Sequence, residues 1–411
     1  MTGKEQIQPQ YAEAFQCIGN ECTDSCCVGW QVSIDRQTYE KYQTLPDLLP
    51  ILNAKTTLNP DAGDRNYARI NMEANRCPFL SEDRLCSIQK AHGAEYLCRT
   101  CAEFPRAVRV DCNVTKKTLM MSCPEAARIV LLNPNLLSDE EVGGGTHARY
   151  KHFLFPKSAS SPKGTDPLDA LWKLQRFSVV LLTDRRYPMW QRLFILGMFC
   201  SRLHELSVTQ QANQAPALLD NYAQLIVNKR LLGLMGKIQA RPGFQLDVTC
   251  KFVGRALQLT EGSSFRESLA DFRAGIPFTG DIADQSVLAA YDAARSQFYA
   301  PLMQTYPHLL ENYLTNYILQ RGFLALNPAD RHAYDLPTEY FVMCTHFVVI
   351  KTMLIGIAGH YREQFGTQHV VKLVQGFSKA AEHNPAFMDE VAGFINDSGL
   401  NRPGQMATLL E

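Results

Sequence analysis

The spacing of apolar residues changes partway along the chain. From Asp166 onward, apolar side chains return every three or four residues, which is the period of an amphipathic helix. The pattern predicts helices around residues 168–181, 193–203, 217–235, 251–270, 285–326 and 337–362. Glycine and proline clusters such as Arg241-Pro242-Gly243 separate them, and no regular alternation of strands with helices appears. We therefore expect a helical, bundle-like domain over residues 167–411 and no doubly wound nucleotide-binding sheet.

One stretch of this domain, Phe341 to Ala358, is strongly apolar and near the length of a membrane-spanning helix. Cys344, Thr345, His346 and Lys351 interrupt it, and polar side chains are costly in a lipid bilayer. We expect a buried core helix here. A peripheral membrane association is an alternative that the sequence leaves open.

Shorter and more broken elements are predicted before this domain. Asp35 can cap a helix that runs on through Tyr42. Further elements are expected as a helix over Ser87–Leu97, a strand over Leu119–Ser122 and a helix over Glu125–Leu132. Few apolar residues are available for a core in this N-terminal part. It therefore needs additional cross-links, such as metal–thiolate bonds, to be stable. We predict a small, loop-rich, metal- or iron–sulfur-binding domain over residues 1–135.

Residues 136–166 differ in composition from both neighbours. The run Gly143-Gly144-Gly145 and the Ser-, Pro- and Lys-rich stretch at 158–164 predict a linker or a long loop. A phosphate-binding loop is the alternative, but the glycines lack the Walker pattern and the GxGxxG spacing. The predicted fold class is therefore mainly α: a small cysteine-cluster N-terminal domain followed by an α-helical bundle-like domain.

The balanced net charge argues against nucleic acid as a partner and indicates no other partner. Lys plus Arg and Asp plus Glu both number 41, so there is no basic excess of the kind that binds nucleic acid. The first residues, MTGKEQIQPQYAEAF, contain no apolar segment of the secretory type. We expect a cytoplasmic protein, whose cysteines stay reduced.

The cysteines supply the candidate chemistry, because ten of the thirteen fall within the first 123 residues. They form a first group of Cys17, Cys22, Cys26 and Cys27, and a second group of Cys77, Cys86, Cys98, Cys101, Cys112 and Cys123. Thiolates are soft ligands that select zinc, copper(I) or iron–sulfur centres. A disulfide framework fits poorly with an odd count, with adjacent Cys26 and Cys27, and with a reducing compartment.

Spacing alone leaves the metal open. Cys98-x-x-Cys101 and Cys22-x-x-x-Cys26 could form the two knuckles of a structural zinc site, which spacing favours slightly because zinc sites are commoner. A [4Fe–4S] cluster would draw on Cys26-Cys27 together with a distant Cys-Pro pair, Cys77-Pro78 or Cys123-Pro124. The C-x3-C-x2-C signature of radical S-adenosylmethionine enzymes is absent, since Gly29 occupies its third position.

The cysteine pattern resembles the zinc- or iron-chelating cysteine-rich family. The segments that carry the resemblance are Cys22…Cys26-Cys27, Cys77-Pro-Phe-Leu…Leu85-Cys86-Ser-Ile, and Cys98…Cys101…Phe104-Pro105-Arg106. Within that family, Phe15-Gln-Cys17-Ile-Gly…Cys27-Val-Gly-Trp30 and Ser122-Cys123-Pro124-Glu125 are similar to bacterial flagellin lysine-N-methyltransferases. The resemblance covers about the first third of the chain.

This resemblance implies methyl transfer from S-adenosylmethionine to lysine ε-amines of flagellin, with a [4Fe–4S] cluster in the cysteine-rich part. The cluster ligands would come from Cys17, Cys22, Cys26, Cys27, Cys77, Cys86, Cys98, Cys101 and Cys123, with Cys98 and Cys112 as the weaker candidates. One cubane needs four thiolates, so the set is too large unless two centres exist. A non-enzymatic zinc or iron–sulfur module that docks another protein is the alternative function.

The implied reaction needs a neutral amine, whereas a free lysine has a pKa of about 10.4. The protein must desolvate the ammonium or remove its proton, typically with a tyrosine or a carboxylate. Tyr299, Tyr306, Tyr313 and Tyr317 recur near one helical face and could line such a site, although a packing stripe is the simpler interpretation. The sequence identifies neither a catalytic base, nor the cofactor pocket, nor the oligomeric state.

Overall fold

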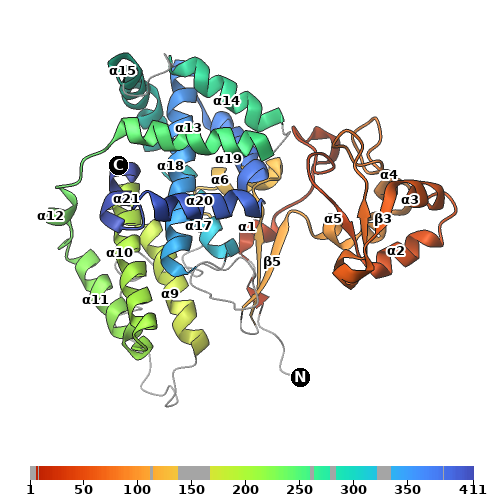
Figure 1. Ribbon diagram of the computed structural model, residues 1–411, viewed down its shortest axis with the longest axis horizontal. Coiled ribbons are helices and arrows are strands. Elements are labelled where there is room, and N and C mark those ends of the chain that lie inside the picture. The colour runs from red at the N-terminus through yellow and green to blue at the C-terminus, as the bar shows by residue number, and fades with distance from the viewer. Residues whose placement is uncertain are drawn as a thin grey trace.

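The computed structural model describes residues 6–7, 9–111, 114–137, 167–259, 263–277, 284–321, 335–382 and 384–411. It is mainly helical, as the sequence predicts, and consists of a small lobe beside a larger helical domain (Figure 1). Cys112, the three-glycine run and nearly all of the predicted linker lie outside the described residues. The domain boundaries drawn from the sequence stay a prediction.

The small lobe is built on a three-stranded antiparallel sheet in the order β2-β4-β3. Its strands are β2 (Ser33–Ile34), β4 (Ala68–Ile70) and β3 (Thr56–Leu58), and its main helices are α2 (Arg36–Gln43) and α3 (Leu49–Lys55). The Asp35 side chain accepts a hydrogen bond from the Thr38 amide at 3.0 Å, which confirms the predicted helix cap. A small core of twelve buried residues holds the lobe together.

The helix predicted over residues 87–97 is wrong in its extent. Instead, α4 (Ser87–His92) ends at Gly93, a short 3₁₀ turn follows at Ala94–Tyr96, and α5 (Arg99–Glu103) begins after Cys98. Gly93 has a φ of +95°, which glycine adopts readily and other residues rarely do. Cys86 and Cys98 therefore precede two different helices rather than lying at the two ends of one.

A second sheet packs against the helical domain rather than within the small lobe. Its order is β1 (Gln6–Ile7), β6 (Val114–Leu119) and β5 (Arg106–Asp111). The predicted strand at 119–122 is corrected, because β6 ends at Leu119 and the chain turns before α6 (Pro124–Leu132). Asn316 donates to the Leu119 carbonyl at 2.9 Å and accepts from the Tyr11 hydroxyl of α1 (Gln10–Glu13) at 2.8 Å. The flanks of the cysteine-rich region are thus anchored on the helices.

The larger domain is formed by helices throughout its described residues. They are α9 (Pro167–Leu182), α10 (Met189–Val208), α11 (Ala215–Val227), α12 (Leu232–Met235), α13 (Pro242–Leu259), α14 (Ser263–Gly275), α15 (Gln285–Ala294), α16 (Ala300–Thr305), α17 (His308–Arg321), α18 (Leu336–Tyr361), α19 (Thr367–Phe377), α20 (Pro385–Asp397) and α21 (Pro403–Leu410). Two π-helical turns, η6 (Arg295–Tyr299) and η8 (Ser378–Glu382), extend α15 and α19.

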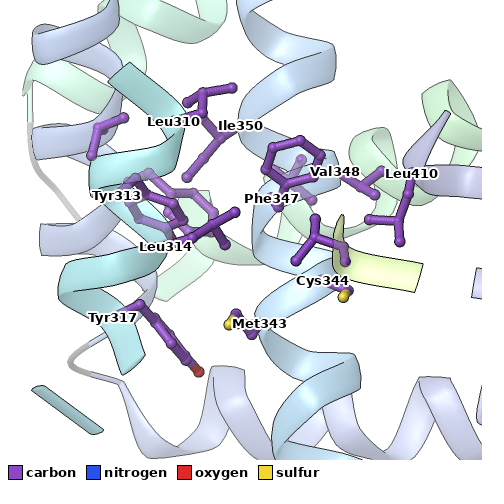
Figure 2. Packing of buried hydrophobic residues seen from close by; sticks show 14 of the residues in the cluster. Leu310, Tyr313, Leu314, Tyr317, Met343, Cys344, Phe347, Val348, Ile350 and Leu410 are labelled. Carbon is purple, nitrogen blue, oxygen red and sulfur yellow. The ribbon is translucent and has the colours of Figure 1, made fainter. Parts of the chain in front are cut away.

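Helix α18 is the centre of this domain and contacts α10, α13, α14, α17, α19, α20 and α21 (Figure 1). It is long and apolar enough to cross a membrane, but its most apolar stretch is wholly buried among the other helices. Figure 2 shows residues of α17 and α18, among them Leu314 and Phe347, packed together in this core. The prediction of a buried core helix is confirmed, and a peripheral membrane association stays a prediction.

Candidate metal centre

Five cysteines border the core of the small lobe, and we call Cys27, Cys77, Cys86, Cys98 and Cys101 the inner thiol group. Hydrogen bonds between backbone segments place these cysteines near one another. The Cys77 amide donates to the Cys27 carbonyl at 2.9 Å, and a bridge between Leu80 and Cys86 folds the next cysteine back. Cys98 precedes α5 and Cys101 lies one turn into it, so both side chains lie on the same side of that helix.

The thiols of the inner group interact with one another. A hydrogen bond between Cys98 and Cys101 lowers the pKa of Cys98 and raises that of Cys101. Cys101 also interacts electrostatically with Cys27 and Cys86. Burial raises the pKa of Cys77 to about 11. Burial also raises the pKa of Cys86. A bound metal ion would favour the thiolate form of these sulfurs.

Four further cysteines form a second set toward the helical domain, and we call Cys17, Cys22, Cys26 and Cys123 the outer thiol group. Cys22 interacts electrostatically with Cys26 and Cys17, and Cys123 interacts with Cys22 and Cys26. Cys26 and Cys27 are hydrogen-bonded, so the two groups meet at this adjacent pair. Burial raises the pKa of Cys123 to about 12. All nine cysteines predicted as metal ligands therefore fall into two neighbouring groups.

The chemistry of these donors fits a zinc or iron–sulfur centre, because soft sulfur ligands are gathered in one part of the molecule. The twelve described cysteines are all free thiols. Across the described residues, however, no three His, Cys, Asp or Glu side chains are arranged to bind one metal ion together. The thiols therefore lie near one another, but their sulfur atoms are not arranged around a common metal position. Their assignment as ligands stays a prediction.

The remaining described cysteines differ in setting. Cys200 and Cys344 are buried among apolar helices, and burial raises the pKa of both thiols. Cys250 is partly buried on α13. All three lie on helices of the larger domain, namely α10, α13 and α18.

The outer thiol group is held to the helical domain by one carboxylate, that of Asp24. Asp24 Oδ2 accepts from Gln375 Nε2 at 2.9 Å and from Lys379 Nζ at 2.8 Å. Gln375 also donates to the Ser122 carbonyl at 2.9 Å, and Lys379 to the Ser25 carbonyl at 3.2 Å. We call this arrangement the Asp24 clamp. It fixes the segment before Cys26 and the residue before Cys123 on α19 and η8.

No pattern in the sequence predicts the residues of the Asp24 clamp. Asp24 lies between two cysteines, and that position was the one available signal. Gln375 and Lys379 are four residues apart on a helical segment and so share a face, but nothing local distinguishes them from other surface positions. Their partner lies more than 350 residues away, as the separation of 351 between Gln375 and Asp24 shows.

The four tyrosines noted in the sequence are not equivalent. Tyr306 is exposed, whereas Tyr299, Tyr313 and Tyr317 are buried in the core of the helical domain. The Tyr313 hydroxyl donates to Glu382 Oε1 at 2.7 Å, and the Tyr317 hydroxyl lies 3.3 Å from Glu339 Oε1. Tyr313 and Tyr317 are therefore both packed in the core and paired with a carboxylate.

The fold and the site define a class of protein in which a thiol-rich small lobe is docked on a helical domain. Residues 175–409 match the model of the FliB lysine N-methylase C-terminal domain, which is more than half of the chain. The chain therefore belongs to this lysine N-methylase family.

Curated proteins with similar sequences agree with this assignment. The chain is 31% identical to the flagellar biosynthetic protein FliU of Salmonella muenchen over 134 residues, which are 32% of this chain and 79% of that protein. It is 32% identical to the lysine-N-methylase of Salmonella typhimurium over 145 residues, which are 33% of this chain and 34% of that protein. The match to the lysine-N-methylase of Salmonella choleraesuis is also 32% over 142 residues, 33% of this chain and 34% of that protein.

The matched segments thus span about a third of the length of the two lysine-N-methylases. No solved structure matches the chain. The family and the names of these relatives support lysine methylation as the activity.

Proposed function

We propose that this protein is a cytoplasmic protein-lysine N-methyltransferase that transfers methyl groups from S-adenosylmethionine to flagellin and carries a [4Fe–4S] cluster. The observation that carries the proposal is membership of the lysine N-methylase family over residues 175–409. Flagellin is proposed as the substrate because one similar protein is named for flagellar biosynthesis. The cluster is proposed because nine thiols gather in and beside the small lobe.

The inner thiol group would hold the cluster. Four sulfurs suffice for one cubane, and this group offers five within one small core. A bound cluster supplies either a one-electron carrier or a cross-link that stabilises its domain. Tyr42 is buried beside Cys86, Cys98 and Cys101, and its hydroxyl donates to the Tyr96 carbonyl at 2.6 Å.

The methyl acceptor imposes the second requirement. Lysine attacks a methyl group only as the neutral amine, so the site has to take a proton from the ammonium or desolvate it. A buried carboxylate beside aromatic rings meets both needs, because the carboxylate accepts the proton and the rings attract the cation. The helical domain, to which the family match is confined, is where we expect this acceptor site.

Metal analysis and methylation assays on anaerobically purified protein test the proposal. We expect about four iron and four sulfide per chain, as a cubane requires. We also expect transfer of labelled methyl from S-adenosylmethionine to lysines of flagellin. Zinc without sulfide, together with no methylation, would contradict the proposal and favour a non-enzymatic zinc module.

A matched pair of cysteine variants sharpens this test. Cys77→Ser removes a thiol of the inner group, and we expect loss of most bound iron and of activity. Cys200→Ser removes a thiol that is also buried but lies on α10 of the helical domain, and this variant should retain its iron and its activity. Equal iron content in the two variants would show that Cys77 is not a ligand.

A further inference from the structure

A cluster of polar side chains lies inside the helical domain, where α17, α18 and the π-helical turn η8 meet. It consists of Tyr313, Tyr317, Glu339, His346 and Glu382, and we call it the carboxylate–tyrosine cluster. Tyr313 donates to Glu382 Oε1 at 2.7 Å, and Ser378 donates to Glu382 Oε2 at 2.6 Å. Figure 2 shows Tyr313 and Tyr317 on the face of α17 that packs toward α18.

His346 is the member of this cluster that lacks a partner. Its side chain is 1% exposed, and neither ring nitrogen has a hydrogen-bond partner among the residues that the structure describes. The distance from His346 Nδ1 to Glu382 Oε1 is 3.9 Å, which is too long for a hydrogen bond. Buried polar groups are nearly always satisfied, so an unpartnered imidazole here indicates that a polar ligand or water belongs beside it.

The charge of the cluster indicates which ligand it favours. Glu339 interacts with Arg321, whose Nε lies 3.4 Å from Glu339 Oε1. Within the described residues, Glu382 accepts hydrogen bonds from the Tyr313 and Ser378 hydroxyls, and no lysine or arginine lies within ion-pair distance of it. The cluster thus holds two carboxylates and one guanidinium. Arg321 also interacts electrostatically with Glu382, so one guanidinium serves two carboxylates. A cationic ligand would compensate the remaining negative charge.

Aromatic rings surround the same position. The His346 ring lies 5.8 Å from the Tyr317 ring and 5.2 Å from the Phe377 ring, both nearly edge to face, and 6.0 Å from the Phe387 ring. Aromatic faces attract alkylammonium and sulfonium groups through their quadrupoles. Carboxylates and aromatic rings together therefore select an organic cation rather than a metal ion.

The cluster also opens toward solvent and adjoins the thiol-rich lobe. The side chains of Glu382 and Glu339 are 12% and 16% exposed, so the cluster is not sealed. Glu382 lies in the same π-helical turn as Lys379 of the Asp24 clamp. Such turns occur frequently at functional sites, and this one joins the cluster to the segment that carries Cys22 and Cys26.

We propose that the carboxylate–tyrosine cluster binds an alkyl cation of the methyl-transfer reaction, either the ε-ammonium of the target lysine or the sulfonium of the methyl donor. This inference rests on the proposed function. For a bound lysine, the Glu382 carboxylate takes one proton from the ammonium. The nitrogen lone pair then forms the C–N bond to the methyl carbon while the C–S bond breaks, and its electrons leave with sulfur as a neutral thioether.

Binding measurements test the cluster without relying on activity. We would titrate n-butylammonium, its uncharged analogue 1-butanol and S-adenosylmethionine separately into the full chain, and follow the ring ¹⁵N signals of His346 by NMR. We expect a cation to shift these signals and Glu382→Gln to weaken its binding at least tenfold. A response to n-butylammonium identifies the lysine site, and a Glu382-dependent response to S-adenosylmethionine identifies the sulfonium site. Equal binding of 1-butanol, or unchanged binding in Glu382→Gln, would overturn the proposal.

Kinetics of the same variants separate this inference from the proposed function. Glu382→Gln keeps the size of the side chain, and Tyr313→Phe is a second variant that removes only the hydroxyl. Tyr340→Phe is the matched control, because Tyr340 is equally buried but donates to the Leu193 carbonyl, outside the cluster. We expect at least tenfold lower methylation in Glu382→Gln and no such loss in Tyr340→Phe.

The combined outcomes are distinct. Normal methylation by Glu382→Gln would refute the cluster while leaving the methyltransferase function intact. Absence of methylation in the unmodified protein, with Glu382-dependent cation binding retained, would refute the function and leave the cluster as a cation site.

Discussion

Lys351 lies on α18 with its ammonium group inside the helical domain. Its Nζ donates to the carbonyls of Leu410 at 2.9 Å and Glu411 at 2.6 Å, and so ties the central helix to α21. Burial lowers the pKa of Lys351 from 10.5 to about 7, and the nearby Arg295 acts in the same direction. The stability of the fold therefore depends on the protonation of one side chain near neutral pH.

The sign of this dependence follows from the two pKa values. Between pH 7 and 10.5 the unfolded chain keeps the Lys351 proton and the folded chain does not, so raising the pH favours the folded chain. We expect the free energy of unfolding of the unmodified protein to rise relative to Lys351→Met by about 1.4 kcal/mol per pH unit in this window. Below pH 7 the difference should level off. Chemical denaturation at several pH values measures it, and a constant difference across the window would contradict the prediction.

At the scale of elements, α14 and α18 cross unusually closely, and glycines make this possible. A Cβ on Gly275 would lie 1.8 Å from the Gly356 carbonyl oxygen, and one on Gly356 would lie 2.3 Å from the Phe272 ring. The absence of side chains lets the two backbones approach. This close contact holds α14 against the centre of the domain.

Gly275→Ala should therefore be costly, because its methyl group meets backbone rather than a movable side chain. We expect a loss of about 1–3 kcal/mol in the free energy of unfolding, measured by urea denaturation. Gly254→Ala on α13 is the control, since a Cβ there meets nothing within 4 Å. That variant should be neutral or stabilised by up to about 1 kcal/mol. Equal effects of the two substitutions would show that the crossing tolerates a side chain.

The sequence predicts an element well where residues within that element determine its position. Asp35 marks the start of α2 because its side chain caps the helix, and the apolar run of 341–358 marks α18 because a buried helix needs no polar face. The helix over 87–97 was overextended because Gly93 breaks it by its backbone conformation. The pairing of Tyr313 with Glu382 could not be predicted, since a contact between residues 69 apart leaves no periodic signal.

At the scale of the whole molecule, the thiol-rich lobe and the helical domain meet at the Asp24 clamp. The Asp24 and Lys379 side chains are only 14% and 12% exposed, so water screens this ion pair weakly. The clamp also aligns the thiol-bearing segment with η8, which carries Glu382. The relative position of the two candidate sites therefore depends on this contact.

Removing the cation of the clamp should loosen the thiol-bearing segment without unfolding the helices. In Lys379→Met we expect about thirtyfold faster hydrogen exchange of backbone amides around residues 22–27, which corresponds to about 2 kcal/mol. Hydrogen-exchange mass spectrometry measures this change. Arg202→Met, which breaks the exposed pair with Glu205, should leave exchange throughout the protein unchanged. Unaltered exchange at 22–27 in Lys379→Met would show that Gln375 alone holds the segment.

The clamp also has a consequence for biosynthesis. Asp24 and Lys379 are 355 residues apart, so at about 5–20 residues per second the ribosome needs roughly 20 to 70 s to make the second after the first. Cys123 is made 99 residues after Asp24, so in the later part of that interval the whole outer thiol group is synthesised but the helices that dock on it are not. If these thiols bind the proposed metal centre, Cys22, Cys26 and Cys123 are accessible to it in this period, before α19 and η8 dock beside them.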